Sequence, residues 1–174
     1  MIFLDPDLEP DPAPRANSAK RPSGSAQPAI SRSHRMPSAR TLARFLREAQ
    51  AAAKLAGQVT VLLTSDAEIR RLNRRFRGKN KATDVLSFPA AEAVAAEVAG
   101  DLAISIPTAR RQAAEQGNSL TTEIKVLMLH GILHLAGYDH EADSGQMARR
   151  ERALRARLRL PQGLIERAGR GEQP

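Results

Sequence analysis

The stretch from Thr121 to Ala136 constrains the fold more than any other part of the sequence. It is long enough for a helix and apolar on nearly every side, although His130 and His134 stand within it. A helix that is hydrophobic all round is normally buried, so we expect this one to occupy the centre of a domain. Gly137 is expected to end it, because glycine readily takes the left-handed conformation found just after helix C-termini.

Around this helix the sequence alternates between helical and extended patterns, with few strands. Strands are predicted at residues 59–63, 84–88 and 100–105, where β-branched and aliphatic residues cluster. Further helices are predicted from about Ser38 to Leu55, from Ser65 through Phe76, from Pro107 to Gly117 and from Ser144 to Leu158. The expected fold is therefore one α/β (α+β) domain with a small mixed β-sheet packed by helices.

The helix that begins at Ser65 combines a capping signal with an apolar stripe. Ser65 and Glu68 have the spacing of a capping box, in which both side chains bind free backbone N–H groups at the helix start. Ile69, Leu72 and Phe76 follow at helical spacing, so we expect all three to point inward.

Domain organisation is indicated by the places where proline and serine gather. Residues 1–37 are mostly of a composition that buries too little apolar surface to fold, so disorder is expected over most of this segment. Residues 2–4 are apolar and could form a short edge strand. The functional domain is expected at residues 38–160 and a flexible tail at 161–174.

Composition excludes several classes of protein. The chain contains no cysteine, which removes disulfide frameworks, cysteine-based zinc sites and cysteine nucleophiles. It has no apolar run near the roughly 20 residues that a membrane-spanning helix requires. Acidic residues and prolines interrupt the start of the chain, so no signal peptide is expected and a cytoplasmic location is the default.

Histidines spaced for metal binding lie in the segment from residue 130 to residue 140. His130 and His134 are four positions apart, which places both imidazoles on one face of a helix. After the turn at Gly137, His140 can arrive from a loop as a third ligand. Three protein ligands leave a position open, which is typical of catalytic metal sites. We expect one Zn²⁺ per chain, while nickel, copper and iron stay open as alternatives.

The spacing HxxxHxxGxxH also occurs in one class of zinc metalloproteases. In those enzymes a glutamate follows the first histidine and acts as the general base. Here that position is Gly131, which has no side chain to accept a proton. A metal-dependent peptidase or other hydrolase is therefore an alternative, but not the favoured one.

A run of basic residues without an intervening acid lies between residues 70 and 81. Its members are Arg70, Arg71, Arg74, Arg75, Arg77, Lys79 and Lys81. A solvated helix face is the simplest interpretation, but like charges without acidic partners in the run repel one another. The run therefore favours a partner that carries phosphates. Aromatic residues that could stack on bases are few nearby (Phe76, Phe88 and Tyr138), so recognition is expected to rest more on the nucleic-acid backbone than on its bases.

Taken together, three blocks of sequence resemble the bacterial YbeY endoribonucleases, which are rRNA maturation factors. The blocks are LNRRFRGKNKATDVLSFP (72–89), GDLAIS (100–105) and HGILHLAGYDH (130–140). The resemblance implies a zinc-dependent, single-strand-specific endoribonuclease that acts in 3′-end maturation of 16S rRNA and in ribosome quality control. The implied partners are single-stranded RNA or rRNA and the ribosome or its small subunit, with no membrane and no small-molecule organic cofactor.

The resemblance also implies roles for individual residues. His130, His134 and His140 match the metal ligands of the family, and Arg77 matches an arginine proposed to act beside the metal. Arg77 could hold the scissile phosphate or stabilise negative charge on its oxygens. Neighbouring basic residues are expected to contact RNA: Arg74, Arg75, Lys79 and Lys81.

Some features leave the interpretation open. Asn80 and Ala82 stand where the family usually has Asp and Pro, and both are expected to loosen the loop slightly. Asp139 adjoins His140 and is expected to orient a metal ligand or to cap the turn. No residue is securely identified as a general base. A ribosome-assembly factor with a structural metal and no catalytic activity is the remaining alternative.

Overall fold

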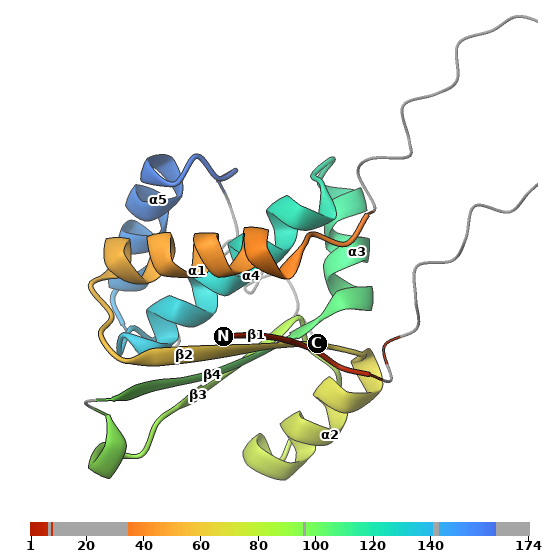
Figure 1. The fold of residues 1–174 in the computed structure, drawn as a ribbon, viewed down its shortest axis with the longest axis horizontal. Helices are drawn as coiled ribbons and strands as arrows, with labels where there is room; N and C mark the ends of the chain where they lie inside the picture. Colours follow the sequence, from red (N-terminus) through yellow and green to blue (C-terminus); the bar gives the residue numbers. More distant parts are fainter. Residues whose placement is uncertain (7, 9–34, 96, 141–142, 163–174) are drawn as a thin grey trace, which may run out of the picture.

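The computed structural model describes residues 1–6, 8, 35–95, 97–140 and 143–162 (Figure 1). Its strands are β1 (Ile2–Leu4), β2 (Gln58–Thr64), β3 (Val85–Pro89) and β4 (Val98–Ser105). Its helices are α1 (Ala39–Ala53), α2 (Asp66–Arg77), the short helix η2 (Glu92–Val94), α3 (Ile106–Glu115), α4 (Leu120–Leu135) and α5 (Gln146–Arg157). Most of the predicted disordered segment and of the predicted flexible tail lies outside the described residues. Within the described ranges, no helix is long and apolar enough to cross a bilayer.

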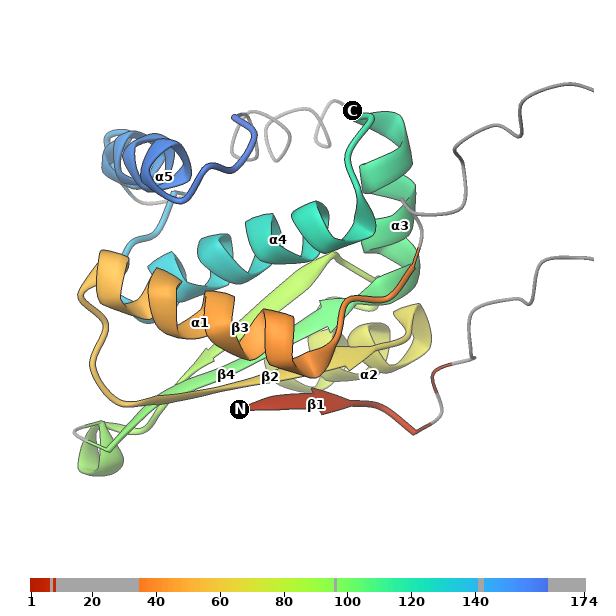
Figure 2. The same cartoon turned by 45° about the horizontal axis from the view of Figure 1, so that its top comes forward.

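The strands of the described chain form one mixed sheet in the order β1-β2-β4-β3. β1 is parallel to β2 and β2 to β4, whereas β3 is antiparallel to β4. The predicted small mixed sheet is thus confirmed, and the strand expected at residues 2–4 is β1 at one edge. In Figures 1 and 2, α1 and α4 lie over one face of the sheet and α2 lies under the other.

The helix α4 is central, as its apolar sequence predicts. It packs against β3, β4, α1, α3 and α5. Its fully buried side chains include Ile124, Val126, Leu127, Met128, Leu129, Ile132 and Leu133. Gly131 lets the helix approach the sheet closely, since a Cβ there would lie 2.6 Å from Leu102 Cδ2 on β4. The helix that carries His130 and His134 is therefore held on several sides.

The face of the sheet under α2 has a much smaller core. It is formed by Ile69, Leu86 and Ala103, with Leu72 and Phe88 packed at the margin. The prediction that Phe76 points inward is wrong, because its side chain is 57 % exposed. Phe76 lies in the last turn of α2, beyond this small cluster, and its ring meets that of Phe88 at the margin.

Serine is the N-cap residue of the helices α1, α2, α3 and α4. The hydroxyls of Ser38, Ser65, Ser105 and Ser119 each accept a hydrogen bond from the backbone N–H three residues further on. These bonds satisfy donors that a helix start otherwise leaves free. The serine half of the predicted capping box is therefore present at Ser65. The Glu68 carboxylate binds Arg71, with an oxygen–nitrogen distance of 2.6 Å.

Candidate metal centre

The three predicted metal ligands lie together at the end of α4. His130 and His134 are one turn apart on the helix, and their Nε2 atoms are separated by 3.2 Å. Gly137 follows with a φ of +88°, which turns the chain and brings His140 back towards the helix. One ring nitrogen from each histidine can be chosen so that all three lie within 4.8 Å of one another. The fold thus assembles the cluster that the spacing predicts.

Two features of the cluster fit a divalent cation. Burial, together with the nearby His130 and His140, lowers the pKa of His134 to about 4, so its ring is neutral near pH 7 and offers a lone pair. His140 Nδ1 is buried and has no hydrogen-bond partner in the described part of the chain. A buried polar atom without a protein partner is normally satisfied by water or by an ion. Neutral imidazole nitrogens are donors that zinc accepts in a site without cysteine.

A buried acidic residue to which the sequence assigned no role holds His130. Glu151 Oε2 lies 3.0 Å from His130 Nδ1, and Arg155 pairs with the same carboxylate. Glu151 and Arg155 are 2 % and 1 % exposed. Burial raises the pKa of the Glu151 carboxyl, but the hydrogen bond from His130 and the charge of Arg155 outweigh this and leave the pKa below its usual value. An ionised carboxylate accepts hydrogen bonds, so His130 Nδ1 donates and its Nε2 is left for the cluster.

Asp139, the acid expected to orient a ligand or cap the turn, contributes its charge and its backbone carbonyl to this arrangement. Its charge raises the pKa of His134, against the larger effect of burial. Its backbone carbonyl accepts a hydrogen bond from the Asp143 N–H at 2.9 Å. The carboxylate of Asp143 accepts from the backbone N–H groups at the start of α5. A ligand-orienting role for Asp139 stays a prediction.

Gly131 leaves the centre without the acid–base residue of the metalloproteases. A Cβ at this position would lie 2.6 Å from Leu102 Cδ2 and 3.2 Å from Ser87 Oγ, which both belong to the sheet. A side chain at residue 131 would therefore enter the core and would not face the histidines. The packing of α4 disfavours the peptidase interpretation independently of the motif.

Arg77 is the last residue of α2 and lies near the histidine cluster. Its side chain is exposed, and its positive charge is one of the influences that lower the pKa of His134. This influence is the smallest of those that act on His134, after burial and the charges of its neighbours. A role for Arg77 beside the histidines stays a prediction.

The other predicted RNA-binding residues are exposed around the end of α2. They are Arg74 and Arg75 in its last turn, and Lys79 and Lys81 in the following loop. Two side chains of α2 hold this loop. Arg70 Nε donates to Asn80 Oδ1 at 2.9 Å, and Asn73 Nδ2 donates to the Lys81 carbonyl at 2.8 Å. Asn80 therefore ties the loop to the helix, and the expectation that it does so less firmly than an Asp stays a prediction.

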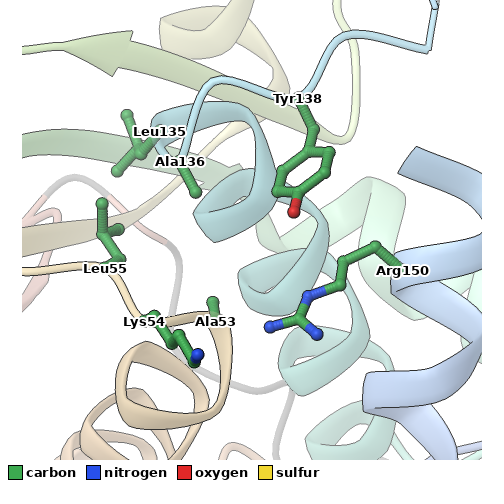
Figure 3. A pocket seen from close by; sticks show the side chains of 7 residues that line it. All are labelled: Ala53, Lys54, Leu55, Leu135, Ala136, Tyr138 and Arg150. Carbon is green, nitrogen blue, oxygen red and sulfur yellow. The ribbon is translucent and has the colours of Figure 1, made fainter. Parts of the chain in front are cut away.

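A separate pocket lies between the ends of α1 and α4 and one side of α5 (Figure 3). It has a volume of about 570 Å³ and is lined by Ala53, Lys54, Leu55, Leu135, Ala136, Tyr138 and Arg150. Arg150 Nη2 donates to the Ala52 carbonyl at 3.0 Å, which ties α5 to the end of α1. None of the three histidines lines this pocket, so it is distinct from the candidate metal centre.

Comparisons with known proteins give the chain a family. Residues 27–159 match the family profile described as endoribonuclease YbeY. This chain belongs to the YbeY family. Its YbeY relatives include proteins from Koribacter versatilis and Solibacter usitatus, both described as endoribonuclease YbeY, which are 55 % and 53 % identical over 130 and 124 residues. These matches cover 75 % and 71 % of this chain and 84 % and 82 % of the relatives.

This YbeY family member also has a solved structural neighbour. The solution structure of TM1509 from Thermotoga maritima matches it with a TM-score of 0.50 at 28 % sequence identity. The match covers 81 % of this chain and 94 % of that protein. The mixed α+β architecture around α4 is therefore shared with a structure determined independently.

Proposed function

We propose that this chain is a metal-dependent endoribonuclease that cuts single-stranded RNA, with zinc as its resident ion. We further propose that it acts in 3′-end maturation of 16S rRNA and in ribosome quality control, which would bring it to the small ribosomal subunit in the cytoplasm. The observation that carries the proposal is the cluster of His130, His134 and His140 in a chain of the YbeY family. The domain proposed to carry the activity spans residues 38–160, and β1 adds an edge strand to its sheet.

In this proposal His130, His134 and His140 hold one ion per chain. Bound there, the ion would supply Lewis acidity to a phosphate oxygen or to water. Glu151, itself held by Arg155, keeps His130 in the tautomer whose Nε2 can bind the ion. Three protein ligands leave room at the ion for a substrate oxygen.

Arg77 is proposed to hold the scissile phosphate and to offset the negative charge that develops on its oxygens. A guanidinium is suited to this, because it presents several N–H donors in one plane and stays charged at every working pH. Glu151 is not the proton-transfer group in this scheme, since it is 2 % exposed and already binds His130 and Arg155. The exposed cations Arg74, Arg75, Lys79 and Lys81 would bind neighbouring phosphates of the strand.

The proposal is tested by incubating the zinc-loaded protein with single-stranded RNA and, separately, with casein. The matched control is His134→Ala in both assays. We expect wild-type protein to cleave RNA, the variant to leave it intact, and neither to cleave casein. His134→Ala should also lose stoichiometric zinc, measured by metal analysis of the purified protein, while its circular dichroism stays that of a folded α+β protein.

The control variant is essential because a chain with a net charge of +8 can carry contaminating ribonucleases through purification. Equal RNA cleavage by wild type and His134→Ala would overturn the proposal. Zinc-dependent casein cleavage would identify a peptidase instead. Binding of RNA without metal-dependent cleavage would identify a non-catalytic assembly factor whose metal is structural.

A further inference from the structure

Phe76 is an exposed aromatic ring within a basic surface. Its side chain is 57 % exposed, although phenylalanine is among the residues most often buried. It lies in the last turn of α2, next in sequence to Arg77. We propose that Phe76, supported by Phe88, is the stacking site for one base of a single-stranded RNA. This inference rests on the proposed function, because it assumes that RNA is the substrate.

Phe88 holds the ring of Phe76 in a defined position. The two ring centroids are 5.2 Å apart and the ring planes differ by 66°, an edge-to-face arrangement that aromatic pairs favour. Phe88 is half-buried on β3, where it lies opposite Asp101 of β4. Since the sheet fixes Phe88, the ring of Phe76 is a supported platform. A base that stacks on a supported ring orders fewer protein side chains than one that binds a loose ring.

Positive charge surrounds this platform. The Arg75 guanidinium carbon lies 5.4 Å from the centroid of the Phe76 ring. Arg74 and Arg77 stand in the same last turn of the helix. Single-strand binding sites combine a basic groove for the phosphates with aromatic rings for the bases. Phe76 directly precedes Arg77 in the chain, so a base on Phe76 would belong to a nucleotide next to the phosphate that Arg77 is proposed to hold.

The surrounding charge favours a nucleic-acid base over an apolar protein surface as the occupant. A protein that covered Phe76 with apolar side chains would also remove water from the guanidinium groups of Arg74 and Arg75, and burying a charge without a partner is costly. A nucleic acid pairs those groups with phosphates while its base covers the ring. Recognition would then include one base contact, in addition to the backbone contacts expected from the sequence.

The test measures binding of a fluorescein-labelled single-stranded RNA of about ten nucleotides. Fluorescence anisotropy is recorded on the full chain in EDTA, which prevents metal-dependent cleavage. Phe76→Leu removes the aromatic face but keeps an apolar side chain, and should weaken binding by about five-fold or more. The matched control is Phe3→Leu, because Phe3 is 48 % exposed and lies on β1 at the opposite edge of the sheet. That variant should bind like wild type.

A tryptophan variant gives a second, direct readout. The chain contains no tryptophan, so Phe76→Trp introduces a single fluorophore at the proposed platform. This variant should bind RNA at least as tightly as wild type, and its emission should be quenched at saturating RNA. It also keeps the inference testable if thermal unfolding shows that Phe76→Leu does not fold. Unchanged tryptophan emission at saturating RNA would overturn the stacking site.

An abasic oligonucleotide of the same length separates stacking from charge. Wild type should bind the abasic strand more weakly than RNA, and Phe76→Leu should reduce that difference. The salt dependence of RNA binding should not change in Phe76→Leu, because the substitution removes no cation. Equal RNA affinity of wild type and Phe76→Leu overturns the inference even if metal-dependent cleavage is observed. If Phe76→Leu weakens RNA binding but no metal-dependent cleavage is observed, the stacking site is supported and the nuclease function is overturned.

Discussion

The helices α4 and α2 lie on opposite faces of one sheet and contribute to the candidate site in opposite ways. α4 packs against three helices and two strands, so His130 and His134 stand on a firmly held element. α2 rests on a small apolar cluster and presents Arg74, Arg75 and Arg77 to solvent. Ligands of an ion need fixed positions, whereas cations can attract phosphates from flexible side chains. Changes on α4 should therefore alter metal binding and stability, and changes on α2 should alter the handling of RNA.

Arg77→Ala on α2 is expected to give the largest effect on RNA cleavage among the substitutions outside the histidines. Loss of a group that stabilises transition-state charge should lower the cleavage rate by about 100- to 1000-fold. Zinc content and thermal unfolding should match those of wild type, because Arg77 is exposed. Arg44→Ala on α1 makes the same change in net charge at an exposed position and should cleave normally. Undiminished cleavage by Arg77→Ala would show that α2 contributes no catalytic group.

Glu151→Gln should weaken zinc binding by about 10- to 100-fold, because an amide is a poorer acceptor for His130 Nδ1–H than a carboxylate. Competition with a chromogenic chelator measures the affinity without relying on cleavage. Asp139→Asn is the matched variant, as it removes the acid that the sequence favoured for the same task. We expect Asp139→Asn to lose less zinc affinity than Glu151→Gln. A larger loss of zinc affinity in Asp139→Asn than in Glu151→Gln would instead identify Asp139 as the residue that orients a ligand.

Gly131→Ala should lower the free energy of unfolding by about 1–3 kcal/mol, the usual cost of overpacking a core. The added methyl group would lie 2.6 Å from Cδ2 of the buried Leu102, so this side chain must repack or α4 must move away from the sheet. Arg74→Ala on α2 should change the same free energy by less than about 0.5 kcal/mol, because Arg74 is exposed. Urea titrations of both variants measure the contrast. Equal destabilisation would contradict the view that α4 is the more tightly packed of the two helices.

Local physics made several features of the fold and site predictable from the sequence. An uninterrupted apolar pattern is enough to predict α4, and helical periodicity is enough to place His130 and His134 on one of its faces. Gly137 marks the turn because it adopts a φ of +88°. Serines ahead of helical segments mark helix starts for the same local reason. These features depend on residues within a few positions of one another.

Contacts that depend on packing could not be predicted in the same way. Glu151 reaches His130 across 21 positions, which requires α5 to return over α4. The exposure of Phe76 is not predictable from its apolar stripe, which shows which residues share a helix face but not where the core beneath that face ends. The strand order β1-β2-β4-β3 likewise depends on pairings between distant segments. The tie between Arg70 and Asn80 also becomes visible only when the loop is seen against α2.

The smallest expected effect is a change in the salt dependence of RNA binding when one cation is removed from α2. If Arg74 contacts one phosphate, Arg74→Gln should reduce the slope of log affinity against log salt by about 0.7, the value for one neutralised phosphate of a single strand. The slope is measured by anisotropy in EDTA over a series of salt concentrations. Lys125→Gln serves as the control, because Lys125 is a cation on α4 whose ammonium group lies over the ring of Phe45. This variant should leave the slope unchanged. If the slope falls in the Lys125 variant and does not change in the Arg74 variant, the RNA lies on the face of the sheet covered by α1 and α4, and not along α2.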